Sequence, residues 1–309
     1  MLTLLLAVVQ APAVAPLDTI PMLWTPHRVY DTRAKEFADF EQLAAKASRA
    51  DVVFFGEQHD DVATHRMQRA LLESIGRRRG DVVLALEMFE RDVQPHLDSY
   101  LAGATTEDAF LKLARPWPNY ARDYRPLVEY AKSRGWKVVA GNVPRPMAGS
   151  VAKQGLVAIS QLADSTRPWA AAAFECPLDD DYFERFAKVM GGHAAPGLDA
   201  ATTTRQYYEA QCVKDETMAE SVVRARSAAG GAPLVIHVNG SFHSDFGDGT
   251  AERVRRRLPD ARIIVITGVP VHDLDAADAK SERKKGDWIV FTIQPPAKTP
   301  SSTAAAPPR

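Results

Sequence analysis

The sequence has little of what marks several classes of protein. Its 309 residues include only two cysteines, and 38 basic against 39 acidic side chains leave a formal net charge of −1. A charge this balanced gives no electrostatic reason to expect nucleic acid or an anionic membrane as a partner. The apolar run at the start of the chain is too short to cross a bilayer as a helix. With 46% hydrophobic and 25% charged residues, the chain has the composition of an ordinary globular protein.

The first fifteen residues predict an export signal. An apolar run over residues 4–9 precedes Ala13–Ala15, which fits the small-x-small pattern of a signal-peptidase site. No Lys or Arg precedes the run, so an apolar N-terminus without this role is the alternative. The chain as given also lacks a lipobox cysteine near this site. We therefore expect a periplasmic or secreted protein with one domain over residues 16–294 and a disordered tail, rich in Pro, Ala, Ser and Thr, over residues 295–309.

The state of the two cysteines stays open. An even number of cysteines in an exported chain permits a disulfide between Cys176 and Cys212. Two free thiols are the alternative. Neither cysteine lies in a redox motif or beside further zinc ligands.

Two apolar runs typical of buried strands end in the same Gly-x-x-His pattern. Val52–Phe55 leads into Gly56–His59, and Leu234–Val238 leads into Gly240–His243 after one further residue. Between these runs, strands and helices alternate along the chain. This alternation predicts an α/β fold with a mostly parallel central sheet flanked by helices.

Two further strand ends add polar groups. Val82–Leu86 delivers Glu87 at its end, and Lys137–Ala140 leads into a turn that contains Asn142 and Arg145. Because neighbouring parallel strands place their carboxyl ends at the same edge of a sheet, we expect these polar groups to converge there.

The converging groups predict chemistry at this edge. Imidazoles and carboxylates are the usual ligands of zinc, manganese and iron, and equally the usual general acids and bases. We predict His59, Glu87 and His243 as ligands of a divalent metal ion. Glu57 and His59 are the predicted catalytic residues, with Glu57 activating water as a general base. The alternative is that these groups hydrogen-bond to one another and to the turns without any metal.

Residues 151–229 contain no convincing strand. Alanine-rich sequence with helical spacing predicts a helical insertion or subdomain that covers an edge of the sheet.

Blocks of this sequence resemble a known family. They span most of residues 51–270 and occur in the order Phe55–Asp60, Leu86–Phe89, Tyr124–Leu127, Gly141–Arg145, Asp215–Ala219 and Asn239–His243. Together they resemble the ChaN-like haem-binding lipoproteins. The chain is more distantly similar to the Tiki and erythromycin-esterase group, which shares the paired Gly-x-x-His motifs.

The resemblance implies an exported protein that binds haem or an iron complex for iron acquisition, on an α/β core with a helical subdomain. Members of the family have been linked to tyrosine ligation of haem, and Tyr120 and Tyr124 are candidates because they lie at a matching block. Asn142 and Arg145 complete the predicted cofactor-binding set. A haem held between two subunits would require a homodimer, which leaves a second copy open as a partner.

The Tiki and esterase relatives imply the alternative function, a metal-dependent hydrolase. In those relatives the Gly-x-x-His histidines and nearby glutamates serve as metal ligands or bases. The matching residues here are Glu57, His59, Glu87 and His243. The sequence leaves open whether the protein is an enzyme.

Overall fold

The computed structural model describes residues 24–227 and 232–294. The predicted export signal and the predicted disordered tail lie outside these residues. Among the described residues, no helix combines the length and the apolar character that a membrane span requires.

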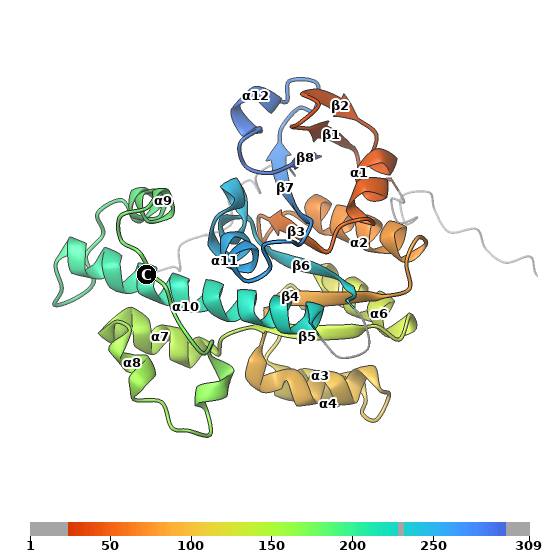
Figure 1. The fold of residues 1–309 in the computed structure, drawn as a ribbon. Helices are drawn as coiled ribbons and strands as arrows, with labels where there is room; N and C mark the ends of the chain where they lie inside the picture. The colour runs from red at the N-terminus through yellow and green to blue at the C-terminus, as the bar shows by residue number, and fades with distance from the viewer. Residues whose placement is uncertain (1–23, 228–231, 295–309) are drawn as a thin grey trace, which may run out of the picture.

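One eight-stranded sheet organises the described residues, with the strand order β2-β1-β8-β7-β3-β6-β4-β5 (Figure 1). The six strands from β8 to β5 in this order are parallel, and β1 pairs antiparallel with β2 and β8. This sheet confirms the predicted α/β fold. The bounds are β1 (His27–Asp31), β2 (Glu36–Ala38), β3 (Val52–Glu57), β4 (Val82–Glu90), β5 (Lys137–Asn142), β6 (Leu234–Gly240), β7 (Ile263–Val271) and β8 (Trp288–Ile293).

Helices cover both faces of the sheet. Their bounds are α1 (Phe40–Ala47), α2 (Val62–Gly76), α3 (Gln94–Leu101), α4 (Glu107–Ala114), α5 (Tyr120–Asp123), α6 (Arg125–Ser133), α7 (Arg145–Gln154), α8 (Val157–Ser160), α9 (Asp181–Met190), α10 (Ala200–Arg226), α11 (Gly249–Arg257) and α12 (Ala279–Glu282). Alternate strand residues point to opposite faces, so Phe55 packs with α1, α2 and α6 while Phe54 packs with α10 and α11. Burying each ring stabilises the fold by about 1.5–3 kcal/mol.

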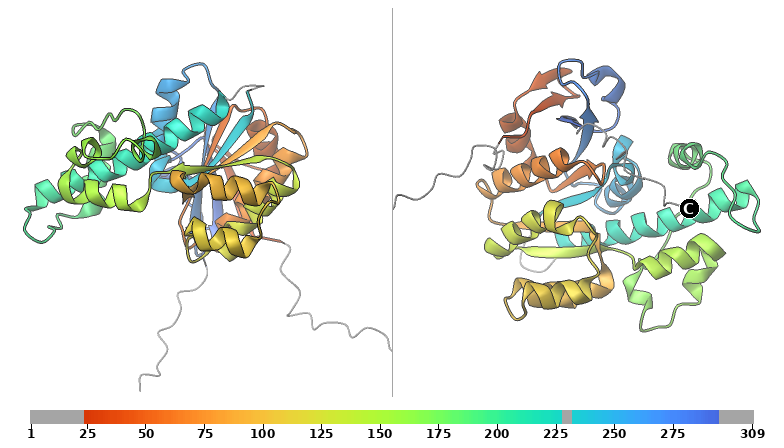
Figure 2. Two further views of the ribbon diagram at one scale, coloured as in Figure 1. Left: turned by 90° about the horizontal axis from the view of Figure 1, so that it is seen from below. Right: turned by 180° about the vertical axis from the view of Figure 1, so that it is seen from behind.

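A helical arm extends beyond the sheet. Figure 2 shows α7, α8, α9 and the first half of α10 projecting away from the sheet beyond the carboxyl end of β5. Between β5 and β6, the described residues up to 227 contain helices and no strand, in the region where the sequence predicts a helical insertion.

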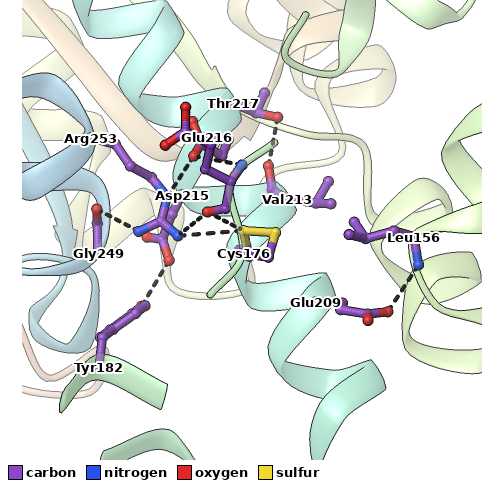
Figure 3. The surroundings of a disulfide bond; sticks show 12 residues. Leu156, Cys176, Tyr182, Glu209, Val213, Asp215, Glu216, Thr217, Gly249 and Arg253 are labelled. Atoms are coloured by element: carbon purple, nitrogen blue, oxygen red, sulfur yellow. Dashed lines mark hydrogen bonds and ion pairs between the residues drawn. A yellow bond between two sulfur atoms is a disulfide. The ribbon is translucent and has the colours of Figure 1, made fainter. Parts of the chain in front are cut away.

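A disulfide joins two parts of this arm. Cys176, in the segment before α9, is bonded to Cys212 of α10, with the two Cα atoms 5.8 Å apart (Figure 3). Of the two alternatives that the sequence leaves open, the structure therefore contains the disulfide.

Candidate functional site

A pocket of about 520 Å³ opens at the carboxyl edge of the sheet, between the strand ends and the helical arm. The ends of β3, β4, β5 and β6 all reach it, as the parallel topology requires. The structure brings six of the predicted site residues to its lining: Glu57, His59, Glu87, Asn142, Arg145 and His243.

Glu57, the last residue of β3, is a buried carboxylate with several hydrogen-bond donors. Its Oε1 accepts hydrogen bonds from His59 Nδ1 at 3.1 Å and from the Tyr124 hydroxyl at 2.6 Å. Its Oε2 accepts from Gln68 Nε2 at 2.7 Å and lies 3.1 Å from His65 Nδ1. Burial alone would raise the pKa of Glu57, but the hydrogen bonds from His59 and His65 lower it. Glu57 is therefore a carboxylate at neutral pH.

His65, on the buried face of α2, lies between two carboxylates. Its Nδ1 contacts Glu57, and its Nε2 lies 3.6 Å from Asp123 Oδ2. Burial alone would lower the pKa of His65, but Glu57 and Asp123 raise it to about 9. His65 is thus a buried cation that compensates Glu57. The sequence does not predict His65 or Asp123 as site residues. The one feature that could indicate His65 is its position on the same face of the helix as the apolar Leu72.

His243 is held between two carboxylates on the other side of the pocket. Its Nδ1 donates to Asp215 Oδ1 at 2.7 Å, and its Nε2 lies 3.4 Å from Glu87 Oε1. Burial alone would lower the pKa of His243, but the charges of Glu87 and Asp215 raise it to about 10. Burial alone would raise the pKa of Glu87, and the charge of His243 holds it well below its usual range. The three groups therefore form a buried network of charges.

Asp215, on α10, is the member of this network that the sequence does not predict as a site residue. Besides His243, it accepts hydrogen bonds from the Tyr182 hydroxyl and the Thr250 hydroxyl, both at 2.8 Å. Burial alone would raise the pKa of Asp215, but the charge of His243 lowers it. The sequence feature that could indicate Asp215 is an acidic residue inside a block that resembles the family. In the structure Asp215 and the adjacent Glu216 are both completely buried.

Tyr120 and Tyr124, the predicted haem ligands, do not line the pocket. Tyr120 is buried against Phe89, with ring centroids 5.7 Å apart, and its hydroxyl lies in the core. Tyr124 is completely buried behind Glu57, to which its hydroxyl donates. Because both rings pack into the core below the pocket, neither hydroxyl is positioned to ligate a molecule held there.

Asn142 and Arg145 differ in what their side chains offer. The Asn142 amide holds the local backbone, since Nδ2 donates to the carbonyl of Glu87 at 3.2 Å and Oδ1 accepts from the amide of Val143 at 2.8 Å. The Arg145 guanidinium is exposed, 5.6 Å from the ring of Trp117, and its Nε lies 3.4 Å from Glu90 Oε1. Asn142 therefore shapes the pocket, whereas Arg145 presents a charge at its mouth.

The predicted metal set does not form a preassembled metal site. In the part of the chain that the structure describes, no group of three or more His, Cys, Asp or Glu side chains is arranged to hold a metal ion. His59, Glu87 and His243 share the pocket, but Glu87 and His243 are engaged with each other and with Asp215. The structure thus gives the divalent-metal prediction no support.

The rim of the pocket is apolar. Its large apolar members are Trp117, Val143, Phe186, Val189 and Phe242, contributed by the loop before α5, the end of β5, α9 and the turn after β6. Trp117 meets the ring of His59 edge-on with centroids 4.8 Å apart, and Val189 is 73% exposed. Lys214 of α10 adds a second cation beside Arg145. The pocket therefore combines apolar side chains and two cations with three carboxylates, Glu57, Glu87 and Glu90, that also line it.

Known proteins resemble this chain in sequence and in fold. The model of the family described as "Haem-binding uptake, Tiki superfamily, ChaN" matches residues 43–254. A curated relative, Protein RETICULATA-RELATED 5, chloroplastic, of Arabidopsis thaliana, is 24% identical over 242 residues, which are 74% of this chain and 32% of that protein. The chain thus spans about a third of the length of that relative.

Solved structures resemble the fold. The structure described as cofacial haem binding to ChaN of Campylobacter jejuni matches with a TM-score of 0.63 and 16% identity, over 87% of this chain and 97% of that one. An erythromycin esterase in its open conformation matches with a TM-score of 0.43 and 14% identity, over 81% of this chain and 77% of that one. The first likeness shows a shared fold, and the second is too low to support an argument.

Proposed function

The chain belongs to the family described as haem-binding uptake, Tiki superfamily, ChaN, and we propose that it binds haem in the pocket at the carboxyl edge of its sheet. The match over residues 43–254 confirms the resemblance that the sequence predicts. The proposal for this chain is carried by one observation: the lining of the pocket combines large apolar side chains with two cations, Lys214 and Arg145, of which Arg145 also pairs with Glu90.

The residues of the pocket fit the chemistry of haem. Its volume of about 520 Å³ lies within the range of small-molecule sites, about 300–1,000 Å³. Trp117, Phe186 and Phe242 offer apolar surface to the porphyrin face, and Arg145 and Lys214 offer charge to its propionates. Haem, when bound, would supply an iron centre able to take a ligand from a protein side chain.

We infer further that the protein is exported and serves iron acquisition. The apolar run before Ala13–Ala15 supports export. The Cys176–Cys212 disulfide also supports it, because disulfides persist in oxidising compartments. Iron acquisition is supported by the family's description as haem-binding uptake.

We also propose a homodimer as the haem-loaded form. The ChaN of Campylobacter jejuni is described by its cofacial haem binding. If this chain binds haem in the same way, two haems stacked face to face would each be presented by one copy. The apolar rim at α9, where Val189 is exposed, supports such an arrangement because it would be covered by the second copy.

A haemin titration tests the proposal. Haemin added to the purified protein should shift the Soret absorbance and saturate at micromolar protein. Lys214→Glu should weaken binding about tenfold, or about 1.4 kcal/mol, because a carboxylate would replace a pocket cation that could pair with the propionates. The dissociation constants come from the absorbance titration of both proteins.

Lys153→Glu is the matched control. Lys153 is exposed on α7 and does not line the pocket, so the same change of charge should leave the haemin affinity unchanged. Absorbance that rises linearly with haemin, without saturation, would contradict haem binding. Equal weakening by both variants would show that net charge, and not the pocket cation, sets the affinity.

Hydrolysis is a second candidate function, favoured by a specific observation. The Nδ1 atom of each pocket imidazole is hydrogen-bonded to a buried carboxylate: His59 to Glu57, and His243 to Asp215. A carboxylate on Nδ1 orients an imidazole so that Nε2 can act as a general base toward water. The Nε2 of His59 has no hydrogen-bond partner among the described residues.

An ester assay tests this candidate. Turnover of p-nitrophenyl acetate should fall at least 100-fold in His59→Ala, as loss of a general base predicts. Turnover that appears only with added Zn²⁺ would support the divalent-metal form of this function. Equal turnover by the wild-type protein and by His59→Ala would exclude His59 as the base.

A further inference from the structure

We propose that the end of the sheet opposite the pocket is a docking surface for a membrane that contains anionic lipids. This surface, the amino-edge face, consists of the segments 49–51, 77–81, 134–137, 224–227 and 255–262, which lie where five parallel strands begin. The proposal does not depend on haem binding. It draws on the proposed export only for the choice between a lipid and a nucleic acid.

The strands that begin at this face are in register. Val52 of β3 pairs with Val235 of β6 and with Ile263 of β7. Val82 of β4 pairs with Leu234 of β6, and β5 begins beside the second residue of β4. The helices α1, α2, α6, α10 and α11 end at the same edge. The amino-edge face is therefore broad and level, and the pocket opens at the other end of the same strands.

Side-chain contacts join neighbouring segments of the face. Arg79 Nη1, after α2, donates to the carbonyl of Ala50, after α1, at 3.3 Å. Arg134 Nη2, after α6, donates to the carbonyl of Gly76 at 3.1 Å. Arg226, at the end of α10, pairs at 2.7 Å with the carboxylate in the segment before β3. These segments, distant in sequence, thus form one continuous surface.

The formal net charge of −1 for the whole chain conceals the charge of this face. Its segments contain twelve Arg and Lys residues but only three acidic residues, Asp51, Asp81 and Asp260. Five of the twelve cations pair with carboxylates outside the segments: Arg78, Arg224, Arg255, Arg256 and Arg257. Even when these carboxylates are included, the face keeps an excess of positive charge.

Four exposed cations account for this excess: Arg49, Arg77, Arg134 and Lys137. None of the four has an ion-pair partner among the described residues, whereas their neighbours share the carboxylates at the edge. Arg134 also caps a helix end through the carbonyl of Gly76. Arg49 and Lys137 make no side-chain hydrogen bond in the part of the chain that the structure describes. Their charged groups are therefore available to an external anion.

A bilayer surface is the anion that fits this face. A guanidinium binds phosphate oxygens through paired hydrogen bonds, and a broad level face can present several cations to headgroups at once. Each Lys or Arg near an anionic membrane raises the affinity by about fivefold. The proposed export favours lipid phosphates over nucleic acid. A protein docked in this way would hold its pocket toward the solvent.

Cosedimentation with vesicles tests the proposal. At low salt the purified protein should sediment with vesicles of equal parts phosphatidylcholine and phosphatidylglycerol, and not with vesicles of phosphatidylcholine alone. Added salt should release it, because salt screens exposed charges. The variant Arg49→Glu, Arg77→Glu, Lys137→Glu should bind the anionic vesicles at least about tenfold more weakly. Circular dichroism confirms that the variant is folded.

The variant Arg66→Glu, Lys153→Glu, Lys188→Glu is the matched control. These three cations are exposed on α2, α7 and α9, away from the amino-edge face, and have no ion-pair partner among the described residues. The control changes the net charge by the same amount as the face variant. It should keep most of the wild-type affinity for the anionic vesicles.

Several results would overturn the proposal. Wild-type protein that stays in solution with anionic vesicles at low salt would show that the face does not dock on lipid. Equal losses in the two triple variants would show that net charge, and not this face, sets the affinity. Equal sedimentation with neutral and anionic vesicles would exclude an electrostatic contact. A DNA duplex bound as tightly as the anionic vesicles would identify nucleic acid as the occupant.

The haemin titration separates this proposal from the proposed function. The face variant should bind haemin as the wild type does, because its three substitutions lie outside the pocket. Absence of haemin binding by the wild type would therefore refute the haem proposal and leave the vesicle result standing.

Discussion

Asp215→Ala should lower the free energy of unfolding by about 3–5 kcal/mol. The carboxylate of Asp215 is completely buried and accepts hydrogen bonds from His243, Tyr182 and Thr250. Removing this carboxylate leaves the hydroxyls of Tyr182 and Thr250 without their acceptor. It also leaves His243 with Glu87 as its one remaining neighbouring carboxylate of the two. Urea unfolding at pH 7, followed by circular dichroism, measures the loss.

The same variant should change how stability depends on pH. The pKa of His243 is raised from 6.5 to about 10 in the folded protein, where it faces Glu87, Asp215 and His59. A raised pKa contributes stability that is fully present below pH 6.5 and is lost as the pH rises toward 10. Without Asp215 that pKa is lower, so the difference between wild type and variant should shrink between pH 7 and pH 10.

Glu252→Ala is the control for this prediction. Glu252 of α11 has a half-exposed carboxylate whose ion-pair partner among the described residues is Arg255, and solvent-accessible pairs of this kind contribute about 0–1 kcal/mol. A loss in Asp215→Ala no larger than in Glu252→Ala would show that the buried network does not stabilise the fold. A difference that stays constant from pH 7 to pH 10 would show that Asp215 does not set the charge of His243.

Strand β3 illustrates what the sequence predicts well. Four consecutive apolar residues, Val52–Phe55, predict a buried strand because both faces of a parallel sheet are covered. The structure confirms that strand, with β3 running from Val52 to Glu57 and buried throughout. Since parallel strands end at one edge, the sequence also predicts that the polar groups at the ends of β3, β4 and β6 lie close together. In the structure these groups do line a single pocket.

Asp215 and His65 illustrate what the sequence cannot predict. Each is a polar residue on the buried face of a helix, and helical periodicity alone makes such a residue look like a break in the apolar stripe. Their partners are distant in the sequence: His243 and Thr250 for Asp215, and Asp123 for His65. Only the packing of α2, α5, α10 and α11 against the sheet brings these charges together.

Tyr120 and Tyr124 show the limit of motif matching. Both lie at a block that resembles the family, but a linear motif does not indicate which side of the chain faces a ligand. In the structure the aromatic rings fill the core beside Phe89 and Glu57, and the pocket lies beyond them. The block match therefore identifies the segment but does not show that either tyrosine hydroxyl faces the pocket.

Reduction of the Cys176–Cys212 disulfide should lower the free energy of unfolding by roughly 3–4 kcal/mol. The bond closes a loop between residues 36 apart in sequence, and opening it releases conformational freedom in the unfolded chain. Urea unfolding with and without dithiothreitol measures the difference. The double variant Cys176→Ser, Cys212→Ser is the control, because it should match the reduced protein and be insensitive to reductant.

The destabilisation should be concentrated next to the pocket. Cys212 lies three residues before Asp215 on α10, and Arg253 Nη2 contacts Cys212 Sγ at 3.4 Å (Figure 3). On the other side of the bond, Cys176 leads into α9, whose Tyr182 donates to Asp215 (Figure 3). Opening the bond therefore frees a segment that supports the carboxylate on which His243 depends.

Hydrogen exchange locates this effect. Amides of α9 should exchange faster in the reduced protein, whereas those of β3 and β6, in the centre of the sheet, should be protected as before. Uniformly faster exchange would mean that the disulfide stabilises the whole domain and not the arm. Identical exchange and identical urea midpoints with and without reductant would contradict the prediction. Faster exchange confined to α9 would show that an ordered pocket requires the intact disulfide. The reason is that Tyr182 of α9 donates to Asp215, so this contact would loosen together with α9.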